Sequence, residues 1–164
     1  LKWLDEHRQT NFFPTEETST ISERASDGTL AAMVWYYNWV NFDGYAKSTR
    51  IAISRELPFS ALIPYFIVDG VLASTRKKFR GNVKKVITDV DDDIMDNDEP
   101  KMRAKLVEEL EFFQGLLKSE DQEYLIAGTT EPTAADFSVF AQVERLVGEG
   151  TASDWDMPPT CQEL

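Results

Sequence analysis

Cysteine and histidine are nearly absent from this sequence, with one of each among its 164 residues. Cys161 has no partner within the chain, which excludes an internal disulfide framework and favours a reducing, intracellular setting. A zinc site or a Ser-His-Asp triad would have to use His7, which lies beside charged residues with no nucleophile motif around it. We therefore expect no metal ligands and no catalytic residue in this chain.

Positive charge is also scarce. Lysine and arginine total 17 against 29 aspartates and glutamates, which gives a formal net charge of −12. A net charge of that size and sign repels phosphate backbones and anionic headgroups at long range. Nucleic acid and acidic membranes are therefore not expected as partners.

No apolar run is long enough to form a transmembrane segment. The best candidate, from Ala61 to Ala73, is interrupted by Pro64 and Asp69 and is too short to cross a bilayer. We expect this stretch to be a buried helix that becomes solvated in its basic second half, over residues 76–85. An acidic run follows at once over residues 89–99, so we expect a charged surface with local ion pairs.

The acidic run has the alternating Asp89, Asp91 and Asp93 with which an EF-hand calcium loop begins. Ile94 stands where that loop needs glycine, and Pro100 stands where it needs a bidentate glutamate. We therefore expect a solvated loop here rather than a calcium site.

Apolar periodicity predicts several helices and no strand. Residues 29–42 carry two apolar stripes, so this helix must be covered on more than one side, and Asp43-Gly44 is expected to end it. Residues 101–118 have apolar residues at spacings of three and four, which make a core-facing stripe of Met102, Leu106, Leu110, Phe113 and Leu117. A further helix is expected within residues 130–147. The sequence thus predicts an all-α fold.

The two ends of the chain have a different character. The first seven residues, LKWLDEH, have the pattern of the last turns of a helix, which suggests that a longer protein extends upstream. The segment after Phe13 is polar, with Pro14 as a breaker and Asp27-Gly28 as a turn signal, and predicts a linker over residues 14–28. Residues 151–164 contain Pro158-Pro159 and are expected to form a loose tail.

The most specific motif of the chain lies at residues 128–137, GTTEPTAADF. Thr133 can cap a helix by accepting from the backbone N–H three residues on, while Asp136 reaches back to the N–H of Thr133. This reciprocal arrangement is a capping box, for which we expect a structural role.

In its context, this motif resembles the C-terminal helical domain of the glutathione transferase superfamily. There, a Tyr-Leu-apolar-small-Gly segment and Pro-Thr-Ala-Ala-Asp-Phe precede the buried central helix of the domain. The resemblance implies that residues 1–13 end a thioredoxin-like domain. It also implies that residues 14–28 link the two domains and that residues 29–150 form the helical bundle.

The resemblance also implies a function for the longer protein. It would transfer glutathione, held by the upstream domain, to an electrophile, with no cofactor held by this chain. The present chain would supply an apolar wall for a hydrophobic electrophile, formed by Trp35, Tyr36 and Trp39, and part of a homodimer interface. A cytoplasmic location is implied.

The segment WYYNW and the later Leu-Pro are similar to the failed-axon-connections and metaxin-like branch of the superfamily, in which a Tyr and a Trp match Tyr36 and Trp39. The Gly-rich, Arg-containing stretch of that branch is missing, because residues 81–89 read GNVKKVITD. This similarity leaves a second hypothesis open. The protein would then be a non-catalytic interaction scaffold, associated with the mitochondrial outer membrane. A third hypothesis is that residues 61–73 bind a partner helix.

Overall fold

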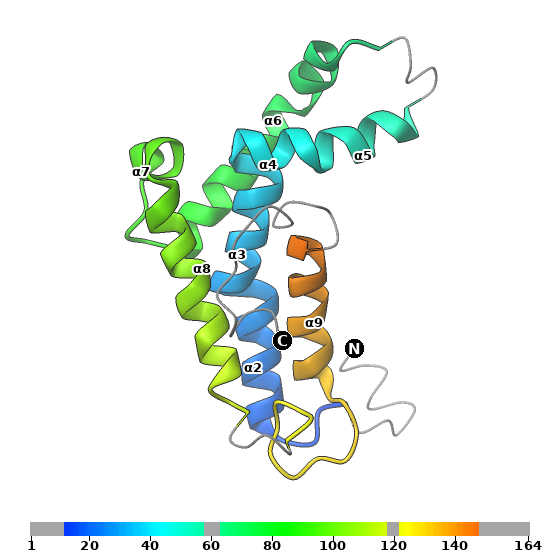
Figure 1. Cartoon of the computed structure of the whole chain (residues 1–164), viewed down its shortest axis with the longest axis vertical. Coiled ribbons are helices and arrows are strands. Elements are labelled where there is room, and N and C mark those ends of the chain that lie inside the picture. The colour runs from blue at the N-terminus through cyan, green and yellow to red at the C-terminus, as the bar shows by residue number, and fades with distance from the viewer. Residues whose placement is uncertain (1–11, 58–62, 118–121, 148–164) are drawn as a thin grey trace.

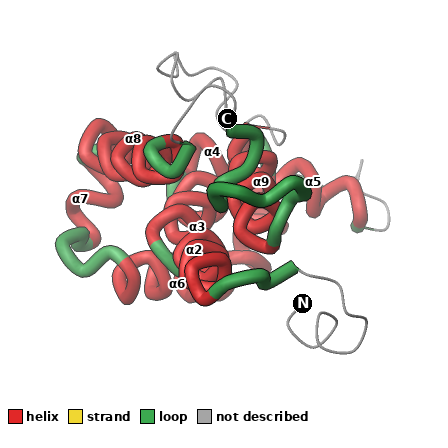
Figure 2. Tube along the Cα trace, turned by 90° about the horizontal axis from the view of Figure 1, so that it is seen from below, coloured by secondary structure: helices red, strands yellow, loops and turns green. Residues whose placement is uncertain are grey.

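The computed structural model describes residues 12–57, 63–117 and 122–147. Within these ranges the chain contains helices and no strand, so the all-α prediction is confirmed. Figures 1 and 2 show the arrangement from two directions. The elements are α2 (Glu16–Asp27), α3 (Thr29–Trp35), the π-helix η1 (Tyr36–Val40), α4 (Phe42–Lys47), α5 (Thr49–Glu56), α6 (Tyr65–Val86), α7 (Asp92–Asn97), α8 (Glu99–Gln114) and α9 (Ala134–Val147).

Helix α3 forms the centre of the bundle. Its residues 30–34 are all buried, as expected for a helix that is apolar on every side. Helices α2, α6, α8 and α9 all pack against it (Figure 2). The apolar stripe predicted for α8 is confirmed, with Met102, Leu106, Leu110 and Phe113 buried and Leu117 packed against the core.

The prediction of a linker over residues 14–28 is wrong, because most of this segment forms α2. Thr15 caps the helix by accepting from the Thr18 N–H at 3.2 Å. Ile21 and Ala25 lie four residues apart on the buried face, next to Thr18 and Ser22, which are also buried. Short hydroxyl side chains made this face look polar in the sequence, but they let α2 approach α9 closely, where Ser22 Oγ lies 2.8 Å from Ser138 Oγ.

The predicted helix over residues 29–42 is interrupted by a π-turn and ends before Asp43-Gly44. The Asn41 N–H donates to the Tyr36 carbonyl at 2.8 Å, which is the i→i+5 bond of a π-helix. Asn41 then leaves the helical conformation, and its side chain caps α4 by accepting from the Gly44 N–H at 2.9 Å. Asp43-Gly44 therefore lies inside the first turn of α4.

Helix α5 and the N-terminal half of α6 project from one end of the bundle as an arm (Figure 1). The expected burial of residues 61–73 is wrong for most of the described part, although Val68 is buried. Helix α6 spans 22 residues, and in its second half Val83 joins the core, so its first turns extend past the bundle. The exposed fractions there are 49% for Tyr65, 74% for Phe66, 47% for Ile67 and 71% for Val71.

The acidic run contains the short helix α7 where a loop was expected. Asp91 caps α7 by accepting from the Ile94 N–H at 2.9 Å, and Asp98 caps α8 in the same way through the Lys101 N–H. Asp92 pairs with Arg80 of α6 at 2.6 Å, as expected for a charged surface with local ion pairs.

Several predictions concern residues outside the described ranges. They include the helix remnant before residue 12, the tail at residues 151–164, His7 and Cys161. No helix among the described residues has the length and apolar character needed to cross a membrane.

Helices α2 and α8 are joined by one ion pair. Arg24 donates from Nε and Nη2 to the two carboxylate oxygens of Glu109, both at 2.8 Å, and its guanidinium lies 3.4 Å from the centre of the Phe112 ring. The Glu109 side chain is only 6% exposed, whereas that of Arg24 is 43% exposed. The hydrogen bonds to Glu109 raise the pKa of Arg24.

We expect Arg24→Leu to destabilise the fold by about 2–4 kcal/mol, because it leaves a buried carboxylate unpaired. The double variant Arg24→Leu with Glu109→Leu should recover most of this loss, since it removes the buried charge as well. Urea denaturation of the two variants and the unchanged protein measures both values. Equal destabilisation by the single and double variants would show that packing, not the ion pair, matters here.

Candidate functional site

Two of the three aromatic residues predicted to contact substrate lie together. Trp39 of η1 stacks on Phe79 of α6, with ring centres 4.7 Å apart and planes 24° apart. Trp35 of α3 meets the same Phe79 ring at 6.1 Å. Both tryptophans are half-buried, so they present an apolar surface at the junction of η1 and α6.

Tyr36 does not share this surface. It is 1% exposed, and its hydroxyl donates to the Met95 carbonyl of α7 at 3.2 Å. Burial is the main cause that raises the pKa of Tyr36. A ligand has no direct access to this side chain, which belongs to the core.

The π-helix exposes backbone carbonyls that the sequence gave no reason to expect. Arg76 of α6 satisfies two of them, donating from Nε to the Trp39 carbonyl at 2.9 Å and from Nη2 to the Val40 carbonyl at 3.2 Å. Its guanidinium also lies 4.4 Å from the centre of the Tyr45 ring. Arg76 thus fixes α6 against the end of the π-turn.

A second charged group lies beside it, at the base of the arm. The Tyr45 hydroxyl donates to Asp69 Oδ1 at 2.9 Å, and Arg50 Nη1 donates to Asp69 Oδ2 at 3.4 Å. The Arg50 guanidinium lies 4.6 Å from the centre of the Tyr65 ring. Arg50 Nε is buried and has no hydrogen-bond partner among the described residues. Burial, followed by the bond to Asp69, raises the pKa of Tyr45 to about 12.

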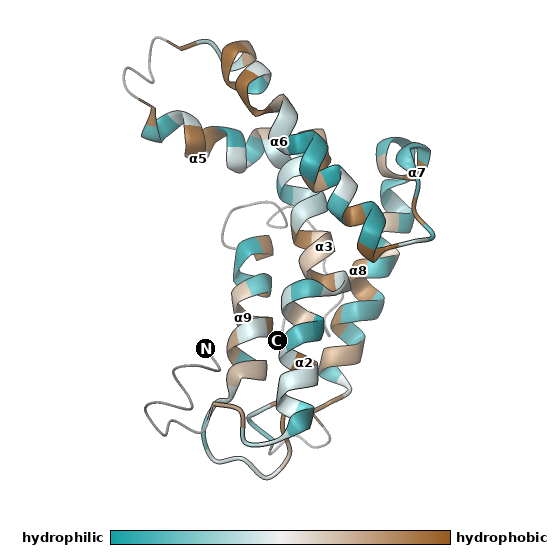
Figure 3. Ribbon diagram, turned by 180° about the vertical axis from the view of Figure 1, so that it is seen from behind, coloured by the Kyte–Doolittle hydropathy of each residue, from teal (hydrophilic) through white to brown (hydrophobic). Residues whose placement is uncertain are grey.

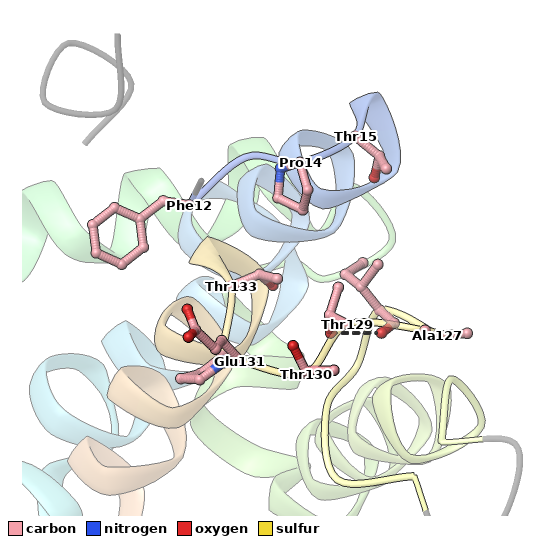
Figure 4. Close-up of a pocket in the computed structure, with 11 residues that line it drawn as sticks. Phe12, Pro14, Thr15, Ala127, Thr129, Thr130, Glu131 and Thr133 are labelled. Atoms are coloured by element: carbon pink, nitrogen blue, oxygen red, sulfur yellow. Dashed lines mark hydrogen bonds between the residues drawn. The ribbon is translucent and has the colours of Figure 1, made fainter. Parts of the chain in front are cut away.

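A cavity of about 640 Å³ lies at the opposite end of the bundle, near the start of α9 (Figure 4). One wall is formed by residues before α2, including Phe12 and Thr15, and the other by the loop of residues 126–133. Its polar groups are chiefly threonine hydroxyls and the Glu131 carboxylate. Among the described residues that line it, there is no lysine, arginine or histidine.

Asp136 orders the loop that borders this cavity. Its Oδ2 accepts from both the backbone N–H and the hydroxyl of Thr133 at 2.7 Å, and its Oδ1 accepts from the Leu125 N–H at 2.7 Å. The reach-back half of the expected capping box is therefore present. The Thr133 hydroxyl donates to Asp136 rather than accepting from the helix, and the bond to Leu125 was not expected.

The family resemblance implied that the helix after this cap is the buried centre of the bundle. The structure places it at the side instead. Helix α9 packs against α2 and α3, and its outer face leaves Phe137 46% and Phe140 65% exposed. The central position belongs to α3.

Sequence reasoning missed the residues at the base of the arm. Arg50, Asp69 and Arg76 come from three separate segments, and no short motif joins them. The usable signal was Asp69 inside an apolar run, since a carboxylate in such a position needs a partner. In the part of the chain that the structure describes, no group of three or more His, Cys, Asp or Glu side chains is placed to hold a metal ion.

Comparison with protein-family models, with curated proteins and with solved structures found no match to this chain. The geometry of the described residues therefore carries the functional argument.

We expect Asp136→Ala to lower the free energy of unfolding by about 2 kcal/mol, because it removes three hydrogen bonds to one carboxylate. Glu131→Ala, in the same loop but exposed, is the control and should change stability by less than about 0.5 kcal/mol. Urea denaturation measures both. A loss for Asp136→Ala no larger than that of the control would contradict the role assigned to this cap.

Tyr45 should make stability fall at high pH. Because its pKa is raised in the folded protein, the phenol ionises more readily after unfolding, so its contribution is present below about pH 10 and is lost as the pH rises toward 12. Between about pH 9 and pH 11, the free energy of unfolding of Tyr45→Phe should therefore fall less than that of the unchanged protein. Urea denaturation at each pH measures both values. Parallel curves for the two proteins would argue against a buried Tyr45–Asp69 bond.

Proposed function

We propose that this chain is the helical domain of a glutathione transferase-like protein. The observation that carries the proposal is the Asp136 carboxylate, which bonds back to Thr133 as the motif at residues 128–137 predicts. The all-helical fold of the described residues is in keeping with it. Glutathione would be held by an upstream thioredoxin-like domain, and the assembly would be a cytoplasmic homodimer.

In this proposal the chemistry is attack of the glutathione thiolate on an electrophilic carbon. A carbon–sulfur bond forms, and the leaving group departs with the electron pair of the bond that breaks. The thiolate would be stabilised by a hydrogen-bond donor of the upstream domain. This chain would contribute binding energy through an apolar wall rather than a catalytic group.

Trp35 and Trp39 are the residues proposed for that wall. Both rest on Phe79, and Arg76 holds the backbone of Trp39 at a fixed position. A flat aromatic electrophile could stack on the half-buried indoles without opening the core. Tyr36 is left out of the wall because its side chain is buried against α7.

Conjugation of glutathione to a chlorodinitrobenzene by the protein with its upstream domain tests this proposal. We expect Trp39→Ala to raise the KM for the electrophile roughly tenfold, since apolar contact area is lost, with little change in the KM for glutathione. Phe140→Ala, which removes an exposed aromatic side chain on α9, is the matched control. A folded protein that binds no glutathione would refute the proposal.

The second candidate function is a non-catalytic scaffold with the same fold, as in the metaxin-like branch. The exposed apolar residues of the arm favour it, because surfaces of that kind mark interaction sites. The two candidates differ upstream of this chain. A thiol-activating Tyr, Ser or Cys followed by a cis-proline motif supports the enzyme, and their absence supports the scaffold.

A further inference from the structure

The charge of this protein is strongly segregated. Residues 47–86, which include the arm, hold nine of the 17 lysines and arginines but only two of the 29 acidic residues. The net negative charge therefore belongs to the rest of the chain. The arm therefore presents net positive charge to an anionic surface that approaches it.

Some of these basic side chains are engaged within the fold. Arg76 bonds the end of the π-helix, and Arg80 and Lys84 pair with Asp92 of α7. Lys77 and Lys78 are exposed and pair with no acidic side chain among the described residues. They follow the exposed apolar turns of the arm on α6 and stand between Arg76, which bonds the end of η1, and Phe79, which packs against the core.

The exposed apolar residues near the tip of the arm share one side of α6. Tyr65 lies next to Arg50 of α5, with the guanidinium 4.6 Å from its ring centre, so it faces the other helix of the arm. Phe66 and Ile67 are 74% and 47% exposed and point away from Tyr65, at about 100° and about 200° around the helix axis. Val71, which is 71% exposed, adds a further apolar side chain one turn below Ile67. The first turns of α6, at the free end of the arm, are coloured mostly as hydrophobic (Figure 3).

Lys77 and Lys78 lie on the same side of α6 as these apolar residues, at about 100° a residue. One side of the helix therefore carries apolar side chains toward the tip and positive charge toward the bundle. That order matches a membrane interface, where the acyl region lies below a layer of anionic phosphates.

The spacing along α6 also fits a membrane interface. With a rise of about 1.5 Å per residue, Lys77 lies roughly 9 Å from Val71 and 15 Å from Ile67 along the helix axis. A tip that enters the headgroup–acyl boundary by about 5–10 Å would therefore bring Lys77 and Lys78 to the level of the lipid phosphates.

The acidic bundle does not prevent this approach. Phe66 lies about 15 Å along α6 from Arg76, which bonds the end of η1. Charges are screened over about 8 Å at physiological ionic strength, so this end of the bundle is roughly two screening lengths away from the tip. The net charge of −12, which argued against acidic membranes, therefore does not describe the surface that the arm presents.

We propose that the arm is a peripheral anchor for anionic lipid membranes, with Phe66, Ile67 and Val71 inserted at the interface and Lys77 and Lys78 at the phosphates. The apolar turns supply the burial and the lysines supply the preference for anionic lipid. This inference is independent of the proposed glutathione transferase function, because it uses none of the residues of the proposed wall.

Co-sedimentation of the full chain with vesicles tests the proposal. One set of vesicles is pure phosphatidylcholine, and the other contains about a third phosphatidylserine, so the two sets differ in negative charge. We expect binding to the phosphatidylserine vesicles that weakens with added salt. Lys77→Gln with Lys78→Gln should weaken it roughly 30-fold, and Phe66→Ser roughly tenfold or more.

Two control variants separate the arm from general effects. Phe140→Ser removes a phenylalanine of similar exposure, 65% against 74% for Phe66, from α9, and Lys101→Gln removes an exposed lysine from α8, so neither should change vesicle binding. Thermal unfolding should be the same for all variants, because each replaced side chain is exposed.

Failure of the unchanged chain to bind either vesicle overturns the proposal, as does equal loss of binding in arm and control variants. Capture of an acidic amphipathic peptide by the arm, with no vesicle binding, would also overturn it and assign the arm to a protein partner. Vesicle binding that depends on Phe66, Lys77 and Lys78 supports it, whatever the outcome of the conjugation assay.

Discussion

The fold depends on one constraint, which is that α3 must be covered on every side. Residues 30–34 are all buried, and a helix of this kind is stable only when neighbours remove its whole surface from water. Helices α2, α6, α8 and α9 provide that cover. The same requirement explains why the polar-looking α2 is a helix of the bundle rather than a linker, since without it one face of α3 would be exposed.

The sequence predicts the parts of this structure that depend on local periodicity. The stripe from Met102 to Phe113 and the reach-back of Asp136 to Thr133 follow from spacing alone, because both involve neighbouring turns of one helix. Burial of the segment around Phe66 could not be judged in this way, because it depends on how far α6 extends past the bundle. The contacts of Arg50 and Asp69 are equally beyond local patterns, since the two residues lie on different helices.

The charged groups at the base of the arm serve as a joint. Arg76 ties α6 to the carbonyls of Trp39 and Val40, while Asp69 ties the same helix to Tyr45 and Arg50. Each link joins a charged side chain to a partly buried partner, where such bonds are stronger than in water. The joint therefore holds α6 in one position against both the proposed aromatic wall and helices α4 and α5.

The π-turn at residues 36–40 has a consequence for how this protein can change over evolution. A π-turn contains one residue more than an α-helical turn, so loss of one residue there would restore a regular helix. Helices α4 and α5, which follow the π-turn directly, would then rotate by about 100° around the axis of α3. Helix α6 could not follow them, because its second half packs on the bundle. The extra residue of the π-turn thus sets the direction in which α5 meets α6, and its deletion would separate the two helices of the arm.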